Sequence, residues 1–313
     1  MIDLLKDRIK GVLFGQAIGD ALGLGTEFMT KEDIMKFYPN SLSDYSQIIQ
    51  DYHRSRWKKG DWTDDTDMML CIANSIIQKK HVDLKNIAQK FKEWFNTNPL
   101  GIGSNTYKVL SFADYTRYPT KGAELVWELS GRRSAANGGI MRTSVIGLWK
   151  ENMEEYAADV CRLTHYDPRC IGSCVIVSSL IHSLVYKSQL LSVSQLIKIG
   201  EKYDNNIREF LIKAEQYSSL DDLALDDAAM GYTLKTMAAA LWCLYHCNNF
   251  EDGLLSIVNA GGDADTNAAV TCSLLGAKYG YSAIPKRYVD GLVRKDYLAH
   301  IVDKITDAFN LNT

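Results

Sequence analysis

The sequence contains little proline and no long basic run. Its 313 residues include only five prolines, so long helices can form between them. The formal net charge is −3, and lysine and arginine are dispersed along the chain. No strong positive field therefore favours nucleic acid or an acidic membrane surface, and we expect neither as a partner.

Paired cysteine spacings are also missing. The seven cysteines include no CxxC pair and stand mostly in apolar stretches such as residues 173–176. They are expected to be buried thiols of a protein in a reducing compartment. Cys243, His246 and Cys247 would share one helix, where core packing is favoured over zinc binding.

The N-terminus carries charges where a signal peptide needs an apolar core. No apolar run approaches the roughly 20 residues that span a bilayer. We therefore expect a soluble, cytoplasmic protein without a membrane segment. Hydrophobic residues make up 46% of the chain, so a sizeable core can form without disulfides.

Helical periodicity dominates what is present. Apolar residues recur at helical spacing in residues 2–13 and 68–77, and residues 157–184, 230–245 and 263–279 are densely apolar. The pattern predicts an all-α fold, a single compact domain over residues 1–313 with polar motifs on short loops. The polar, mixed stretch between residues 187 and 227 is expected to form an insertion or a surface excursion.

Glycine recurs every fourth residue in the first predicted helix, at positions 11, 15, 19 and 23. Glycine is a poor helix former, so the stripe needs an offsetting gain. This spacing puts the glycines on one side of a helix, where the lack of side chains lets another backbone approach closely. The segment can leave helical geometry by Gly19. Gly276 and Gly280 repeat the spacing near the C-terminal end.

Two clusters of Asp and Thr are the strongest candidates for chemistry. Residues 60–67 hold four carboxylates, more than helix capping requires, and their repulsion is costly without a cation. Residues 260–266 contain Asp263, Asp265 and Thr266 before another predicted helix. Oxygen ligands without His or Cys suit Mg²⁺ or Mn²⁺ rather than zinc. Each cluster alone is also readable as a helix cap, but together they can hold two cations about 3.5–4 Å apart if they converge.

Three shorter motifs are ambiguous on their own. Glu27 follows the Gly-Asp-Ala-Leu-Gly stretch and is either a general base or a plain surface acid. Asn137-Gly138-Gly139 is either a phosphate-facing loop or a simple turn. His165 stands before a long apolar helix, where a helix start with Pro168 explains the local sequence equally well.

Taken together and in this order, the motifs resemble the ADP-ribosylglycohydrolase family, which includes the dinitrogenase reductase-activating glycohydrolase and the ADP-ribosylarginine hydrolases. The resemblance spans nearly the whole chain. Its motifs are Gly-Asp-Ala-Leu-Gly at 19–23 with Glu27, Trp-Thr-Asp-Asp-Thr at 62–66, Asn-Gly-Gly-Ile-Met-Arg at 137–142, Thr-His at 164–165, Gly-Tyr-Thr-Leu-Lys-Thr at 231–236 and Gly-Gly-Asp-Ala-Asp-Thr at 261–266. The resemblance implies an orthogonal all-α fold with two Mg²⁺ ions, for which Mn²⁺ is the alternative.

The resemblance also implies roles for single residues. The metal ligands would be Thr63, Asp64, Asp65, Asp263, Asp265 and Thr266. Glu27 matches an acid beside the scissile bond in some members. Substrate would be bound by Asn137, Gly138 and Gly139 around the distal ribose and diphosphate, His165 near the substrate, and Tyr232 against the adenosine. One departure is Gly101-Ile102-Gly103, where many members carry Asp-Ile-Gly.

The implied reaction cleaves the bond between C1″ of the distal ribose and an acceptor nitrogen or oxygen, through an oxocarbenium-like transition state. The metals would orient a water and lower its pKa, and Asp64, Asp65 or Glu27 would accept its proton. The substrate would be an ADP-ribosylated protein or a small ADP-ribose conjugate, and the product ADP-ribose. Arginine is slightly preferred over serine or small O-linked acceptors, and we expect a monomer.

Two rival functions are weighed against this one. A non-catalytic, crystallin-like relative would keep an ADP-ribose pocket but lose metal ligands, and the matching positions are intact. A two-metal phosphohydrolase would commonly use His-Asp ligand pairs, and the sequence has no His-Asp dipeptide.

Overall fold

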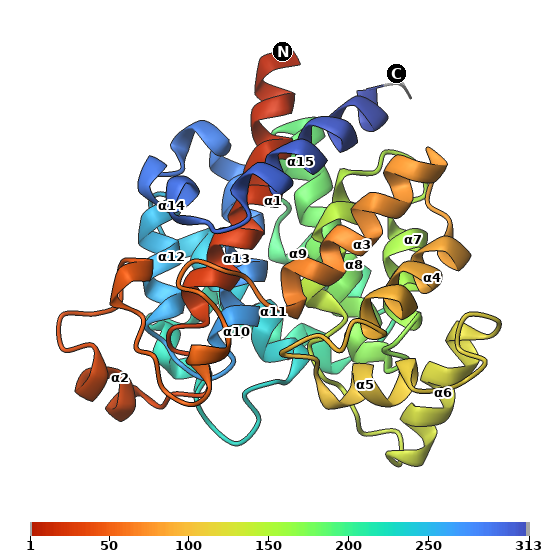
Figure 1. The fold of residues 1–313 in the computed structure, drawn as a ribbon, viewed down its shortest axis with the longest axis horizontal. Helices are drawn as coiled ribbons and strands as arrows, with labels where there is room; N and C mark the ends of the chain where they lie inside the picture. The colour runs from red at the N-terminus through yellow and green to blue at the C-terminus, as the bar shows by residue number, and fades with distance from the viewer. Residues whose placement is uncertain (1, 311–313) are drawn as a thin grey trace.

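Helices α1 (Ile2–Gly23) and α13 (Ala264–Tyr279) lie antiparallel and in contact along their length at the centre of the molecule (Figure 1). The computed structural model describes residues 2–310. Within that range the regular secondary structure is helical, as the apolar periodicity predicted. The β-type pairing described there is limited to two isolated bridges, Met29–Gly262 and Ala136–Tyr232. The all-α prediction is confirmed.

The other helices surround this pair. The α-helices are α2 (Lys31–Phe37), α3 (Asp64–Lys79), α4 (Leu84–Phe95), α5 (Ser104–Leu110), α6 (Pro119–Leu129), α7 (Met153–Arg162), α8 (Pro168–Lys187), α9 (Val193–Gly200), α10 (Asn206–Gln216), α11 (Thr233–His246), α12 (Phe250–Val258), α14 (Lys286–Gly291) and α15 (Lys295–Asn310). The short 3₁₀ segments are η1 (Tyr45–Gln47), η2 (Arg54–Arg56), η3 (Ile140–Leu148), η4 (Leu220–Leu223) and η5 (Tyr281–Ala283).

The glycine stripe of α1 lies directly on α13. A Cβ atom added at any of its four glycines would overlap backbone atoms of α13, at the carbonyls of Gly276, Cys272, Ala268 and Ala264 in turn. The segment stays helical through Gly19 and ends at Gly23. The poor helix propensity of glycine is therefore offset by close backbone packing between two buried helices.

Helix α8 corrects one expectation. We expected no apolar run of about 20 residues, but this 20-residue helix is long and apolar enough to span a membrane by length and composition. However, 83% of its apolar window is buried inside the fold, where α8 packs against α7, η3 and α13. Its apolar composition is explained by this place in the core. As predicted, Pro168 begins the helix, and the Asp167 side chain accepts from the backbone N–H of Arg169.

The expected surface excursion between residues 187 and 227 is wrong for much of that range. Helices α9 and α10 occupy it and pack against α8 and α11. They bury Leu196, Ile207 and Leu211. A short helix needs only one apolar stripe to join a core, so a polar, mixed composition did not exclude packing.

The cysteines are free, and six of the seven are buried, as predicted. His246 stacks on Trp242 at 4.9 Å and lies 3.2 Å from the carbonyl oxygen of Ala214. Cys243 and Cys247 are buried, as core packing predicted, whereas the prediction is wrong for His246, which is exposed.

A methyl group on the α1 glycine face is predicted to destabilise the fold. Gly15→Ala should lower the free energy of unfolding by about 3 kcal/mol, because the new Cβ overlaps the rigid backbone of Cys272 rather than a side chain that can move. Gly103→Ala is the matched control, since a Cβ there meets nothing within 4 Å and its φ of −66° suits alanine. Urea unfolding should find that control within about 1 kcal/mol of the parent. Equal stability of the two variants would contradict the packing account.

Candidate active site

The N-termini of α3 and α13 open onto one cavity of about 760 Å³. Its lining also includes Glu27 and Phe28, residues between 101 and 112, the end of α6 and the loop 134–138. From the two Asp/Thr clusters, the cavity is lined by Asp64, Asp65, Asp263, Asp265 and Thr266. The clusters are far apart in sequence and adjacent in the fold.

Asp20 on α1 fixes the start of α3 through four hydrogen bonds. Its Oδ1 accepts from the backbone N–H and the hydroxyl of Thr63, both at 2.9 Å. Its Oδ2 accepts from the backbone N–H and the hydroxyl of Thr66, at 3.0 and 2.6 Å. These bonds satisfy N–H groups that have no partner within α3. Asp20 therefore sets where the first Asp/Thr cluster lies relative to α1 and α13.

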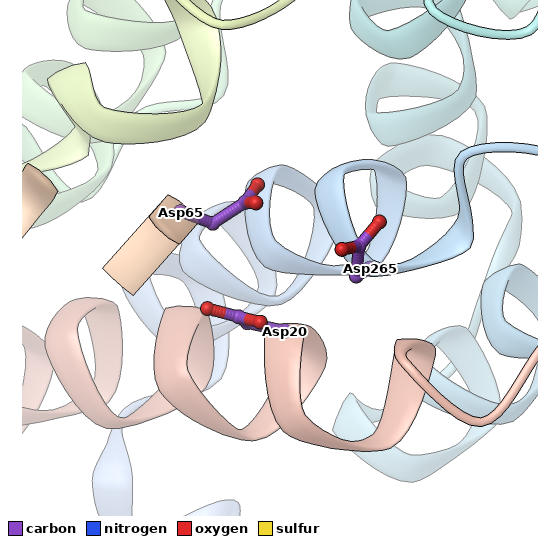
Figure 2. A group of neighbouring side chains, drawn as sticks. All are labelled: Asp20, Asp65 and Asp265. Carbon is purple, nitrogen blue, oxygen red and sulfur yellow. The ribbon is translucent and has the colours of Figure 1, made fainter. Parts of the chain in front are cut away.

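Three carboxylates from three helices point toward one another in Figure 2. Asp20, Asp65 and Asp265 are all buried, and their ligand oxygens lie within 4.8 Å of one another. Glu27, Asp263 and Asp265 form a second such group, so Asp265 belongs to both. Two overlapping carboxylate groups with a shared member are an arrangement that neighbouring cations can occupy.

The residues fit a bound cation. Burial raises the pKa of Asp20 to about 7, and it raises the pKa values of Asp65 and Asp265 well above their ordinary value, with a further contribution from neighbouring carboxylates. Asp65 Oδ1 is buried without a hydrogen-bond partner. A divalent cation would supply both the missing partner and the missing positive charge, and carboxylate and hydroxyl oxygens are its preferred ligands. The cluster is a possible metal centre.

Glu27 is buried, which excludes its interpretation as a plain surface acid. Burial raises the pKa of Glu27, while a hydrogen bond with His53 opposes the rise. Two backbone hydrogen bonds, Phe28 N–H to the Gly262 carbonyl and Gly262 N–H to the Met29 carbonyl, tie its loop to the second cluster. The Asn137 amide donates to Asp263 Oδ2 at 2.8 Å and so orients that carboxylate.

A fully buried arginine holds the Asn-Gly-Gly loop against His165. Arg142 donates to the carbonyl of Gly138 at 2.8 Å and to the hydroxyl of Thr164 at 2.6 Å, and that hydroxyl lies 2.7 Å from His165 Nδ1. Burial, with a smaller effect of Arg142, lowers the pKa of His165 well below its usual value, so the ring is neutral. A Cβ at Gly138 would lie 2.8 Å from His165 Cε1, which explains the glycine.

The predicted site residues fall into two sets. Those that line the cavity are Glu27, Asp64, Asp65, Asn137, Gly138, His165, Asp263, Asp265 and Thr266. Thr63, Gly139 and Tyr232 lie outside its lining. Thr63 is bound to Asp20, and a Cβ at Gly139 would lie 2.9 Å from the sulfur of Cys161. The Tyr232 ring contacts Phe210, at 5.6 Å between centroids, and the Arg169 guanidinium, so its contact with an adenosine stays a prediction.

Gly101 lines the cavity beside Asp64. Its φ of +87° favours glycine, and a Cβ there would lie 2.6 Å from Asp64 Oδ1. A side chain at this position would be strained by the positive φ and would require the Asp64 carboxylate to move. The departure from the Asp-Ile-Gly pattern is consistent with the local geometry.

Sequence reasoning did not assign Asp20, Arg142 or His53 to the site. Asp20 and Arg142 lie inside motifs that were recognised, so the motifs contained the signal although the roles did not follow from it. His53 has no such signal. The apolar part of the lining, Phe112, Val126 and Leu129, also went unassigned.

Comparison with known proteins gives one consistent result. The sequence model of the ADP-ribosylglycohydrolase family matches residues 1–313. ADP-ribosylarginine hydrolase Tri1 of Serratia proteamaculans is 28% identical over 312 residues, which cover 96% of this chain and 79% of that protein. ADP-ribosyl-dinitrogen reductase glycohydrolase of Rhodospirillum rubrum is 27% identical, over 93% of this chain and 92% of its own. A solved structure titled ADP-ribosylglycohydrolase-related protein complex superposes with a TM-score of 0.77 at 24% identity, covering 98% of this chain and 99% of that one.

The metal-free protein is predicted to lose stability as the pH rises from about 3.8, the ordinary pKa of Asp20 that applies in the unfolded chain, to about 7, its pKa in the folded chain. A carboxyl group whose pKa is higher in the folded than in the unfolded chain stabilises the fold while protonated, and this contribution is lost as the pH rises through the folded-state pKa. For Asp20 that pKa is about 7. Added Mg²⁺ should therefore raise Tm more at the upper end of this range than at the lower end. Thermal unfolding with chelator and with Mg²⁺ checks this, and an equal rise at both pH values would contradict it.

Proposed function

Because this chain belongs to the ADP-ribosylglycohydrolase family, we propose that it hydrolyses the glycosidic bond between ADP-ribose and an acceptor side chain, with two Mg²⁺ ions as cofactors. The observation that carries the proposal is the single cavity into which both Asp/Thr clusters, Glu27, Asn137, Gly138 and His165 converge. Its volume of about 760 Å³ is in the range of small-molecule sites.

The cavity offers different chemistry along its wall. Carboxylates gather where α3 and α13 begin, whereas Phe112, Val126 and Leu129 provide an apolar wall from the α5–α6 region. An ADP-ribose molecule has matching parts, namely ribose hydroxyls that suit the carboxylates and an aromatic base that suits the apolar wall. The loop 134–138 lines the same cavity, and we place the diphosphate there, beside Gly138 and neutral His165.

The cation ligands would come from Asp64, Asp65, Asp263, Asp265 and Thr266, with Thr63 supporting Asp65. When bound there, Mg²⁺ or Mn²⁺ supplies the positive charge that orients ribose hydroxyls and lowers the pKa of water. Asn137 keeps the Asp263 carboxylate turned toward the site through its 2.8 Å hydrogen bond. Asp20 holds the start of α3 in place.

We assign Glu27 as the group that accepts a proton from water. It lines the cavity on a loop rather than on the helix starts that supply the other acids, and burial raises its pKa toward the range useful for a general base. Asp64 and Asp65 are the other acids within the same wall, and their place at the start of α3 suits cation binding better.

Arginine is the preferred acceptor. The acceptor would enter beside Glu27 and Phe28, where an acid and an aromatic ring favour a cationic guanidinium. A relative named ADP-ribosylarginine hydrolase matches nearly the whole chain, which supports the same choice. Serine-linked and small O-linked ADP-ribose remain the alternative substrates, and the expected monomeric state and cytoplasmic location stay predictions.

Release of ADP-ribose from arginine-linked and serine-linked substrates, assayed side by side, tests the proposal. Turnover should require Mg²⁺ or Mn²⁺ and cease in excess chelator. Glu27→Gln should lower kcat by about 10²- to 10⁴-fold, the usual contribution of a general base. Glu32→Gln is the matched control, because Glu32 is an exposed acid on nearby α2. Binding of ADP-ribose without turnover of either substrate would favour a non-catalytic binding protein instead.

A further inference from the structure

The segment that contains η2 is bound to the Glu27 loop through the loop backbone. Arg54 is buried, and it donates from Nε to the Gly25 carbonyl at 2.8 Å and from Nη2 to the Glu27 carbonyl at 2.5 Å. Its third contact is with Asp51 Oδ2, 2.5 Å from Nη1. These bonds fix the backbone of the loop, but they leave the direction of the Glu27 carboxylate undetermined.

A second contact from the same segment reaches that carboxylate. His53 Nε2 lies 2.6 Å from Glu27 Oε2. On the other side of the ring, Arg56 Nη2 lies 2.5 Å from His53 Nδ1, and Arg56 Nε donates to the His53 carbonyl at 2.9 Å. A guanidinium group can only donate, so Nδ1 is an acceptor and the ring hydrogen is on Nε2. The His53 ring therefore donates to Glu27.

Aromatic packing restricts the His53 ring. Its centroid lies 5.3 Å from that of Phe28 and 5.5 Å from that of Trp57. The Arg56 guanidinium lies over the Trp57 ring, 4.5 Å from its centroid. Arg56 is therefore held in the position from which it sets the tautomer of His53.

The Glu27 carboxylate needs such a partner because it lies in a cluster with two other acids. It shares a cluster with Asp263 and Asp265, and its side chain is only 9% exposed, so water screens the repulsion poorly. A hydrogen-bond donor on the side away from the cluster opposes this repulsion and fixes one carboxylate oxygen. The other oxygen is left for the cavity.

We infer that His53 is a positioning residue that holds the Glu27 carboxylate toward the reacting bond, with its tautomer set by Arg56. The inference rests on the proposed function for its effect on turnover, whereas the tautomer and the hydrogen bond are properties of the protein alone. His53 acts through Glu27 and belongs to neither Asp/Thr cluster.

Substitutions at His53 distinguish its role as a hydrogen-bond donor to Glu27 from a role in aromatic packing. The terminal amide nitrogen of glutamine reaches the place of Nε2, whereas that of asparagine reaches only the place of Nδ1. His53→Phe keeps an aromatic ring between Phe28 and Trp57 without a donor. We expect His53→Phe and His53→Asn to lower kcat by about 10- to 100-fold with KM changed less than about threefold, since misplacement of a catalytic group acts on the chemical step. His53→Gln should recover kcat to within about threefold of the parent.

A matched control is available at His81, which is exposed and lies beyond the C-terminal end of α3. His81→Phe should leave kcat and KM at the parent values. Parent-like kcat in His53→Phe, or a kcat in His53→Gln as low as that in His53→Phe, would overturn the inference.

Imidazole NMR of the full chain tests the tautomer independently of turnover. The His53 ring signals are identified by their loss in His53→Gln, and their chemical shifts should report hydrogen on Nε2. Arg56→Met should release this constraint and shift the signals toward a mixture of tautomers. Hydrogen on Nδ1 in the parent would overturn the inference. If the parent protein releases no ADP-ribose, the proposed function fails, and the NMR result alone decides the role of His53.

Discussion

The backbone contact between α1 and α13 is the constraint on which the rest of the structure depends. Four glycines on one face of α1 allow it, since any side chain there would meet the carbonyls of α13. This contact brings Asp20 of α1 within reach of Asp265 at the start of α13. Asp20 in turn binds the start of α3 through four hydrogen bonds. One packing interface thus sets the relative positions of both Asp/Thr clusters.

The charge of the site is a second constraint that follows from the first. Close helix packing buries Asp20, Asp65 and Asp265 together. Burial raises all three pKa values, and neighbouring carboxylates raise those of Asp65 and Asp265 further. Such a cluster of buried charges lowers the stability of the folded protein unless a cation or protons neutralise it. The same oxygen-rich cluster that is unfavourable without metal would suit hard cations. Under the proposed function, stability and activity would therefore depend on the same carboxylates.

Much of the fold follows from the sequence because helical periodicity is a local signal. The helices α1, α3, α11 and α13 fall where apolar spacing predicted them. The Asp/Thr clusters also stood out, since four acids in eight residues are unusual in a plain helix cap. Their convergence is a property of tertiary packing, as are the four bonds of Asp20 and the buried position of Glu27. No local pattern contains such information. The segment containing His53 carries no motif at all, so its contact with Glu27 is visible only in three dimensions.

The central claim is that the two Asp/Thr clusters together form one site for two cations, which faces an ADP-ribose pocket. Crystals grown with Mn²⁺ and ADP-ribose test it most directly, through anomalous diffraction at the manganese edge. The account predicts anomalous peaks among Asp65, Asp263 and Asp265, with ADP-ribose density in the adjoining cavity. Manganese found only on other surface carboxylates, with the cavity free of ADP-ribose, would contradict it.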